Sequence, residues 1–203
     1  MMLHFNYIKN LNVKRQEVFT KRHHEIIEDL EKMLEKGVPD LTMSQIASNL
    51  KISLRTLYEI APSKEELIIM ITDSILRKHG KYALESISEV KSPLEKLEKY
   101  LYMVNQVVGP KFNTFFKDIE KIKRLESVVD YHADFITNLT EELLNQSIEA
   151  KEIQDIDSKA FSILLGGIGR EFIKEKNKLS ESSPEESANS ITSIILNGIK
   201  LSN

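Results

Sequence analysis

Helical periodicity is the feature of this sequence that most constrains its fold. Apolar residues recur every three or four positions, as in Ile26, Leu30 and Leu34, and no alternating run bounded by turn residues predicts a strand. The seven glycines and five prolines stand mainly between the periodic segments, as Gly37 and Pro39 do after the first one. The pattern predicts an all-α chain.

Start signals divide this pattern into helices. The segment 92–95 (SPLE) is a strong one, because serine caps a helix, proline suits its first position and glutamate closes a capping box. The helix that begins there is expected to stop at Gly109. We expect a long helical stretch with a break over 112–150, and a final helix over 184–200.

Composition limits the class of protein. The chain has no cysteine, which excludes disulfides and thiolate metal sites. Its longest apolar run covers only residues 67–71, far short of the roughly 18 residues that a membrane span needs. Residues 1–10 have too little apolar length for a signal peptide. We therefore expect a soluble cytoplasmic protein.

The distribution of charge is more informative than the net charge of −3. Residues 1–24 hold five basic side chains and a single acidic one, Glu17. A basic arm at one end of a chain is typical of a DNA contact, and it is equally typical of a solvated, poorly ordered tail. Charge alone leaves both interpretations open.

The segment 42–67, TMSQIASNLKISLRTLYEIAPSKEEL, has the pattern of two short helices followed by a longer one. Capping signals begin at Thr42, at Ser53 and at Ser63. Two short helices joined by about three residues have helix-turn-helix geometry, in which the second helix can enter the DNA major groove. Any helical bundle also contains such pairs, so periodicity alone does not establish DNA binding.

A specific set of residues within this geometry narrows the choice: Met43, Ile46-Ala47, Ile52-Ser53, Thr56-Leu57-Tyr58 and Pro62-Ser63-Lys64-Glu65-Glu66-Leu67. With these residues the segment resembles the DNA-binding domain of the TetR family of bacterial transcriptional regulators. The segments FSILLGGIGREF and SPEESANSITSIILNGIK resemble the last two helices of that family. The resemblance covers nearly the whole chain and is sharp over residues 26–70, whereas 80–150 matches nothing specific.

Two positions in the turn region and one pair at its end depart from the family pattern. Lys51 and Arg55 stand where the family usually has glycine, and Ile60-Ala61 stands where it usually has two aromatic residues. Those aromatics help to seat the recognition helix, and one of them commonly touches phosphate. Their absence makes the packing of this helix the point to examine.

The resemblance implies a basic arm over 1–15, a helix-turn-helix DNA-binding domain over 16–66 and a helical ligand-binding and dimerisation domain over 67–203. It implies a homodimer on a palindromic DNA operator, released by a small-molecule effector. Repression is the usual sign in the family, and these residues do not exclude activation. The alternative is a small-molecule-binding or protein-interaction module of the same fold that no longer reads DNA.

Eight residues are candidates for the DNA contact: Thr42, Ser44, Ser53, Leu54, Arg55, Thr56, Tyr58 and Lys64. The Arg55 guanidinium can read guanine O6 and N7, or it can clamp a phosphate. Tyr58 is similar to a family tyrosine whose hydroxyl meets a phosphate, and Lys64 begins a helix whose N-terminus favours an anion. A role as the N-cap of a helix is enough to explain the threonine at position 42. Glu59 is expected to point away or to pair with a lysine, since an acid near phosphate is unfavourable.

By the same resemblance, an aromatic-rich set is a candidate lining for an effector cavity: Tyr102, Met103, Phe112, Phe115, Phe116, Tyr131, His132 and Phe135. An ordinary bundle core is the alternative. A second set is a candidate two-fold helical interface: Phe161, Leu165, Ile168, Gly169, Phe172, Ile191, Ile194, Ile195 and Gly198. Packing within one chain is the alternative for that set.

Enzymatic interpretations find no support in the sequence. No two of the five histidines have metal-ligand spacing on one helix face. The segment 166–169 (GGIG) lies inside an apolar helix without a preceding strand, so it is not a phosphate loop, and no GxSxG motif occurs. We expect no catalytic site, no cofactor and no metal.

Overall fold

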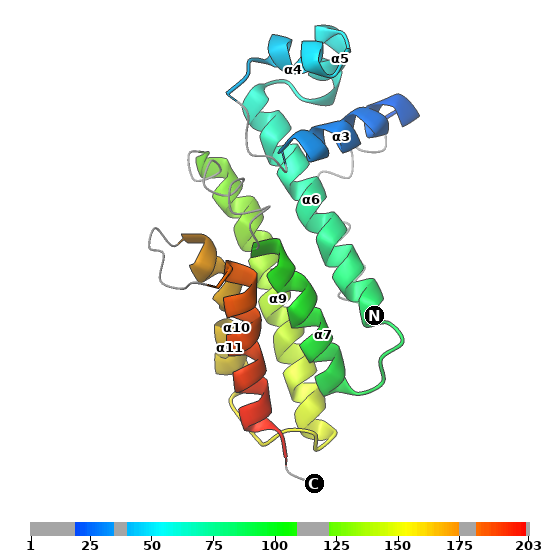
Figure 1. The fold of residues 1–203 in the computed structure, drawn as a ribbon. Coiled ribbons are helices and arrows are strands. Elements are labelled where there is room, and N and C mark those ends of the chain that lie inside the picture. The colour runs from blue at the N-terminus through cyan, green and yellow to red at the C-terminus, as the bar shows by residue number, and fades with distance from the viewer. Residues whose placement is uncertain (1–18, 35–39, 109–121, 175–181, 202–203) are drawn as a thin grey trace. The chain divides into compact units, whose positions relative to one another are not determined.

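A computed structural model describes residues 19–34, 40–108, 122–174 and 182–201 of the chain. Every regular element in these ranges is a helix, and an isolated bridge joins Ile153 to Lys200, which confirms the all-α prediction (Figure 1). The chain divides into two compact units, residues 1–72 and 73–203. The predicted basic arm, 1–15, lies outside the described residues.

The first unit contains α3 (Lys21–Leu34), α4 (Met43–Asn49), α5 (Leu54–Ile60) and the start of α6 (Lys64–Ser86). These helices are held together because each buries its apolar stripe. Burial stabilises the fold by about 25 cal/mol for each Å² of apolar surface removed from water. The buried apolar side chains of this unit are Ile26, Leu30, Leu34, Met43, Ile46, Ala47, Leu57, Ile60, Ala61, Leu67, Ile68 and Ile71.

Side-chain caps fix where these short helices begin. At α4, the Gln45 N–H donates to Thr42 Oγ1 at 3.3 Å and the Thr42 N–H donates to Gln45 Oε1 at 2.8 Å. At α5, Ser53 Oγ accepts from the Thr56 N–H at 3.0 Å. At α6, Ser63 Oγ accepts from the Glu66 N–H at 3.2 Å. All three helix starts predicted from the sequence are thereby confirmed, and the caps satisfy N–H groups that a helix leaves free.

The turn between α4 and α5 is a Schellman motif. The Ile52 N–H donates to the Ala47 carbonyl and the Lys51 N–H donates to the Ser48 carbonyl, both at 3.0 Å. This closure places Lys51 at φ 54°, in the left-handed region that glycine adopts without strain. The conformation explains why the family has glycine at this position, and the lysine here adopts it nonetheless.

The second unit packs α7 (Pro93–Asn105), a 3₁₀ turn η1 (Gln106–Val108), α9 (Lys123–Glu149), α10 (Ser158–Lys174) and α11 (Pro184–Ile199). Helix α9 lies against α7 and α10, and α11 lies against the same two helices. Their shared core comprises Ala83, Ile87, Leu94, Leu97, Tyr100, Leu101, Leu143, Leu144, Ile153, Leu165, Ile168, Ala188, Leu196 and Ile199.

The helix boundaries of this unit follow the sequence signals where the structure describes them. Helix α7 begins with Pro93 after the Ser92 cap, and α11 begins with Pro184, both as predicted. Ser183 and Glu186 form a capping box at the start of α11 that the sequence analysis did not include. The described part of the predicted stretch 112–150 is α9, which begins at Lys123. Residues 112–121, where the sequence predicts the first part of this stretch, lie outside the described residues.

Glu152, which follows α9, connects three segments of the second unit. Its side chain accepts from the Leu94 N–H at 2.8 Å and thereby adds a cap to α7. Its backbone N–H donates to the Ser147 carbonyl at 2.9 Å, and its carbonyl accepts from the Leu201 N–H at 3.1 Å. One residue therefore joins the start of α7, the end of α9 and the segment after α11.

Candidate nucleic-acid interface

The outer face of α5 is the candidate DNA-reading surface. Leu57 and Ile60 face the core, and the opposite side of this two-turn helix presents Leu54, Arg55 and Tyr58. The Arg55 side chain is 90% exposed, so solvent surrounds its guanidinium. A helix with exposed aliphatic, guanidinium and phenol groups on one face can contact a thymine methyl, a guanine edge and a phosphate.

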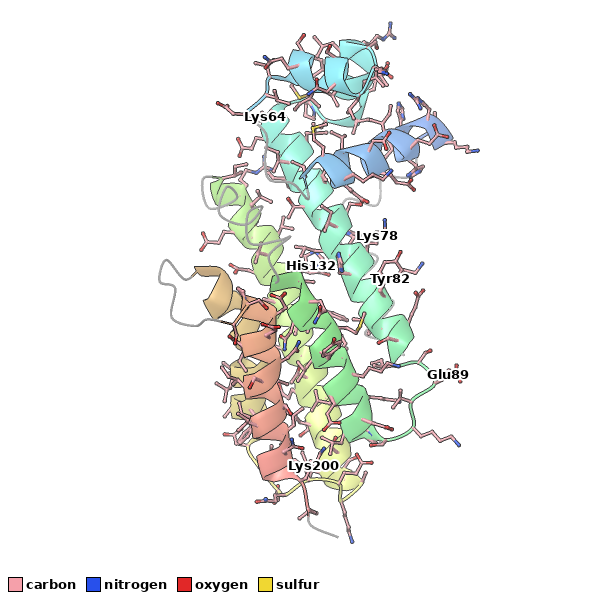
Figure 2. The ribbon with its side chains drawn as sticks, viewed as in Figure 1. Lys64, Lys78, Tyr82, Glu89, His132 and Lys200 are labelled. Atoms are coloured by element: carbon pink, nitrogen blue, oxygen red, sulfur yellow. The ribbon has the colours of Figure 1, made fainter. Side chains whose placement is uncertain are left out.

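The other predicted contact residues lie at helix starts. Ser53 and Thr56 share a 2.7 Å hydrogen bond between their hydroxyls, so Thr56 is already engaged with the cap of α5. Thr42 and Ser44 are exposed at the beginning of α4, where Thr42 is the cap. Lys64 is partly buried in the first turn of α6 (Figure 2). Within the first unit, the predicted residues therefore occupy the starts of three consecutive helices.

The pair that replaces the usual aromatics seats α5 by aliphatic packing. Ile60 is 1% exposed and Ala61 is 2% exposed. The Ala61 N–H donates to the Leu57 carbonyl at 3.0 Å and ends the helix. The departure from the family pattern therefore removes a candidate phosphate contact but leaves α5 packed against the core.

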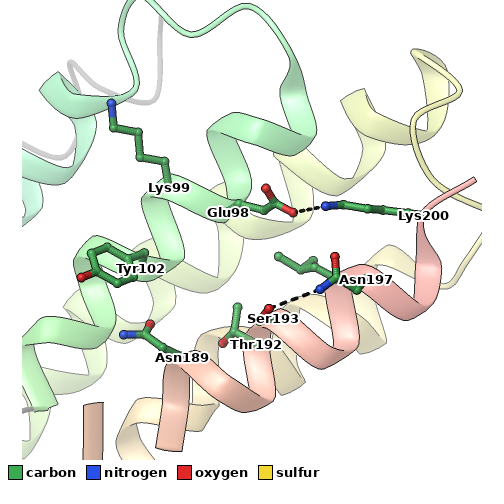
Figure 3. A pocket seen from close by; sticks show the side chains of 9 residues that line it. Glu98, Lys99, Tyr102, Asn189, Thr192, Ser193, Asn197 and Lys200 are labelled. Carbon is green, nitrogen blue, oxygen red and sulfur yellow. Dashed lines mark hydrogen bonds and ion pairs between the residues drawn. The ribbon is translucent and has the colours of Figure 1, made fainter. Parts of the chain in front are cut away.

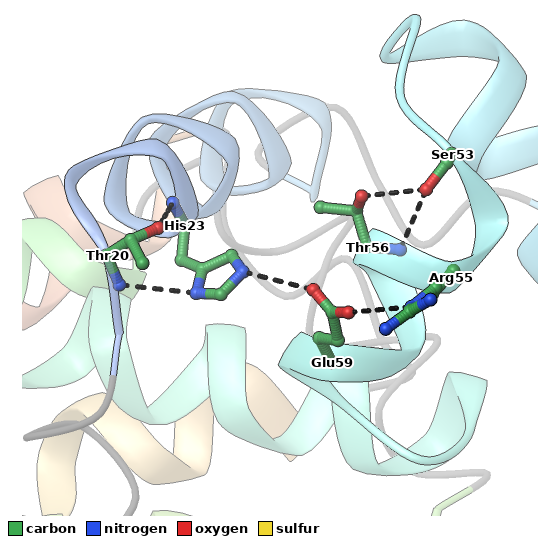
Figure 4. A network of polar contacts seen from close by, with 6 residues as sticks. All are labelled: Thr20, His23, Ser53, Arg55, Thr56 and Glu59. Atoms are coloured by element: carbon green, nitrogen blue, oxygen red, sulfur yellow. Dashed lines mark hydrogen bonds and ion pairs between the residues drawn. The ribbon is translucent and has the colours of Figure 1, made fainter.

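Glu59 contacts Arg55 and His23, two partners that the sequence did not predict for it. Its Oε1 lies 3.1 Å from Arg55 Nε, and its Oε2 lies 3.7 Å from Nε2 of His23, a residue of α3 (Figure 4). Sequence reasoning missed His23. The only local signal for it is its position three residues after Thr20, where a side chain can complete a helix cap.

Solved structures share this fold. A TetR transcription regulator from Haloarcula marismortui ATCC 43049 has a TM-score of 0.75 and 16% identity, over 90% of this chain and 100% of that one. A TetR-family transcriptional regulator from Pectobacterium atrosepticum has a TM-score of 0.70 and 12% identity, over 95% and 99% of the two chains. This chain has the fold of the TetR-family regulators.

A further structure with the TetR-like fold is that of AibR in complex with isovaleryl coenzyme A and operator DNA. It has a TM-score of 0.57 and 16% identity to this chain, and the match covers 86% of this chain and 97% of that one. No protein-family model matches the chain, and no curated protein matches it. The likeness therefore lies in the fold, at low sequence identity.

In the second unit of this TetR-like fold, Tyr102 lies away from the core. Its side chain is 55% exposed and lines a groove of about 470 Å³ between α7 and α11 (Figure 3). Buried Asn105 donates to Asn189 Oδ1 at 3.0 Å and to Thr192 Oγ1 at 3.3 Å, which holds these two groove residues in place. The groove is lined by Glu98, Lys99, Tyr102, Asn189, Thr192, Ser193, Leu196, Asn197 and Lys200.

Another predicted effector-site residue, His132 of α9, is buried in a polar cluster. Its Nε2 lies 3.0 Å from Asp73 Oδ1, and Asp73 Oδ2 accepts from Arg77 Nε at 2.8 Å. Tyr131 packs edge-on against the His132 ring, and Met103 and Phe135 are partly buried. His132 is not among the residues that line the groove beside Tyr102. Phe112, Phe115 and Phe116 lie outside the described residues.

The residues predicted for a two-fold interface fall on different faces. Leu165 and Ile168 are buried in the core of their own chain, which corrects their assignment, and Phe161 and Ile195 are partly buried. Ile191, Ile194 and Gly198 are exposed on α11. The sequence analysis missed Ile163 and Leu164, which are exposed on α10. The side chains at Gly169 and Phe172 are outside the described residues.

Among the residues that the structure describes, no group of histidine and carboxylate side chains could hold a metal ion. Within the same ranges, no helix has the length and apolar character that crossing a membrane requires.

Proposed function

We propose that this chain is a DNA-binding transcriptional regulator that reads its operator with α5. The observation that carries the proposal is the exposed face of α5, where Leu54, Arg55 and Tyr58 stand on a helix whose opposite side is buried. This helix is the second of a helix-turn-helix pair, the position that enters the major groove. The TetR-like fold supports the same assignment.

Positioning and reading fall to different residues in this proposal. Tyr58 and the helix starts at Thr42 and Lys64 contact phosphates and fix the register of the protein. Arg55 donates to guanine O6 and N7, a contact worth about 1–3 kcal/mol of discrimination against other bases. Leu54 contacts a thymine methyl beside it.

A homodimer would double this contact. Helices α10 and α11 pack together and expose four large aliphatic side chains, which we call the outer apolar face: Ile163, Leu164, Ile191 and Ile194. Gly167 and Gly198 have open space around them, which allows close approach of another helix. A second copy seated on this face forms a two-fold bundle and places two α5 helices on a palindromic operator.

The second unit would hold the effector that controls binding. AibR was crystallised with isovaleryl coenzyme A as well as operator DNA, which shows that the fold can bind both kinds of ligand. A small molecule that favours one arrangement of the dimer shifts DNA affinity by its differential binding, and about 1–3 kcal/mol suffices for a switch. In this proposal the bound dimer blocks transcription, and release of the operator by the effector ends the repression.

Selective DNA binding by the purified full-length protein tests the proposal. The protein is used to enrich sites from a random DNA pool and from DNA upstream of its own gene, across a salt series. We expect selective binding that weakens steeply with salt, because phosphate contacts release counterions. Arg55→Ala should relax the preference at one base pair in each half-site by about tenfold to a hundredfold.

Lys81→Ala is the matched control for the loss of one positive charge, because Lys81 is exposed on α6 in the second unit. It should leave the base preference unchanged. If the wild-type protein shows no selectivity over random DNA in either pool, the proposal fails. The fold would then serve as a small-molecule-binding or interaction module without DNA reading.

A further inference from the structure

A chain of polar contacts links the start of α3 to Arg55 (Figure 4). The His23 N–H donates to Thr20 Oγ1 and the Thr20 N–H donates to His23 Nδ1, each at 3.3 Å, which is a capping box with histidine in the third position. Phe19 packs edge-on against the His23 ring at 5.6 Å. The ring of His23 is therefore held in one orientation.

This orientation directs the second ring nitrogen at the recognition helix. Because Nδ1 accepts a hydrogen bond, a neutral His23 ring carries its proton on Nε2. That nitrogen lies 3.7 Å from Glu59 Oε2, and the His23 side chain is only 15% exposed. The partly buried edge of α3 thus faces one oxygen of the Glu59 carboxylate, at a distance longer than a direct hydrogen bond.

The other carboxylate oxygen holds Arg55. Glu59 Oε1 accepts from Arg55 Nε at 3.1 Å, one turn earlier on α5. This bond uses Nε, so it does not occupy the two terminal nitrogens of the exposed guanidinium, which form a fork that matches guanine O6 and N7. An exposed arginine without such a tether would have to lose its rotamer freedom when DNA binds.

We propose that Glu59 is the positioning residue for base reading by Arg55, and that His23 of α3 fixes Glu59 in turn. This inference rests on the proposed function of α5 as the recognition helix. A carboxylate on a DNA-facing helix repels phosphate and lowers affinity for every sequence. The Glu59 carboxylate increases selectivity instead, because a guanidinium that is already oriented before DNA binds favours the one base edge that matches it.

Glu59→Gln separates these two effects, since it removes the charge and nearly preserves the shape. Affinity for random DNA should rise, because one negative charge leaves the interface. The ratio of affinities for the selected site and for the same site with its guanine replaced should fall about threefold to tenfold, as Arg55 loses its fixed geometry. Both affinities are measured by fluorescence anisotropy at one salt concentration.

His23→Gln is a matched variant for the α3 contact. Glutamine is a usual third residue of a capping box, so this substitution keeps the cap of α3 while removing the ring that faces Glu59. We expect an unchanged melting temperature and a smaller fall in the selectivity ratio than Glu59→Gln gives. Full wild-type selectivity in this variant would remove His23 from the inference.

A double-mutant cycle with Arg55→Ala distinguishes positioning from a general loss of structure. Glu59→Gln should leave the ratio unchanged in the Arg55→Ala background, because there is no guanidinium to position. An equal fall in both backgrounds, or an unchanged ratio in the Glu59→Gln single variant, overturns the inference while leaving the proposed function standing. No selective binding by the wild type overturns both.

Discussion

Lys51 adopts the backbone conformation that the turn requires, although the family usually has glycine at this position. The Schellman closure between α4 and α5 requires a positive φ, and Lys51 adopts 54° there. An L-residue in this region has its Cβ close to the following carbonyl oxygen, at a cost of roughly 1–2 kcal/mol that glycine avoids. The turn geometry persists because the two backbone hydrogen bonds and the packing of both helices determine it.

Lys51→Gly should therefore stabilise the first unit. The relief of strain exceeds the greater flexibility of glycine in the unfolded chain, and we expect a net gain of about 0.5–1 kcal/mol in the free energy of unfolding. Denaturant unfolding of the full-length chain measures it. Lys51→Ala is the control, because it removes the same charge and keeps the strain; a gain of equal size in both variants would show that charge and not φ is responsible.

At the residue scale, sequence and structure agree on local features and differ on distant ones. The caps at Thr42, Ser53 and Ser63 depend on neighbours three residues away, so the sequence predicts them. The contact of Glu59 with His23 joins residues that are 36 positions apart in the sequence. The two residues lie on different helices, and packing determines how each helix is rotated about its axis. No local pattern specifies that rotation, and the sequence therefore did not predict the contact between Glu59 and His23.

At the element scale, α10 shows the limit of a periodic pattern. Its stripe of Phe161, Leu165 and Ile168 faces the core, as helical spacing predicts. Ile163 lies on the opposite side and is exposed, and Leu164, which helical spacing places beside the stripe, is exposed as well. Periodicity finds a helix that is apolar on two sides, but it cannot assign which side packs within the chain and which remains open.

The start of α11 is an element whose stability should respond to pH. Hydrogen bonds from the Ser183 backbone and side chain lower the pKa of Glu186 below its usual value of 4.5. A carboxyl with a lowered pKa in the folded state stabilises that state above its ordinary pKa, and the contribution is lost as pH falls through the lowered value. Stability of the second unit should therefore decline below about pH 4.5 in part through this cap.

Comparing the wild type with Glu186→Gln checks this expectation. The amide can still accept the Ser183 N–H, but it does not titrate, so the melting temperature of the variant should fall less steeply between about pH 6 and pH 3. Glu85→Gln is a suitable control, since Glu85 is an exposed carboxylate on α6. Identical pH profiles for the wild type and Glu186→Gln would contradict the assignment.

At the scale of the whole molecule, the outer apolar face on α10 and α11 bears on assembly. Ile194 is 70% exposed within a single chain, so a glutamate there costs the isolated chain little. In a dimer that covers this face, the same substitution buries an unpaired charge. We expect Ile194→Glu to raise the dimer dissociation constant at least about a hundredfold without loss of helix content.

Light scattering after size-exclusion chromatography, together with circular dichroism, measures both quantities. Tyr82→Glu is the matched control, because Tyr82 is a large exposed side chain on α6, whereas the outer apolar face belongs to α10 and α11. The control should remain a dimer. A dimer that persists in Ile194→Glu, or a wild type that is monomeric at high concentration, would contradict assembly through this face.

The all-α architecture could be predicted from caps and periodicity, because both act over short distances. The TetR-like fold could be predicted from the resemblance of the residues in 42–67 to that family. The arrangement of side chains in the second unit could not. Tyr102 and His132 were grouped by aromatic character, yet one lines an open groove and the other is buried beside Asp73. Composition identifies residues suited to a cavity, whereas helix rotation decides which of them share one.

Glu152 makes the two ends of the second unit depend on each other. It caps the start of α7 through its side chain and holds Leu201 through its carbonyl, while the Gln154 N–H donates to the Ile199 carbonyl at 2.9 Å. Fraying at the last turn of α11 must therefore break contacts at the same loop that supports α7. We therefore expect the segment after α11 and the start of α7 to open together, although they are about a hundred residues apart in the sequence.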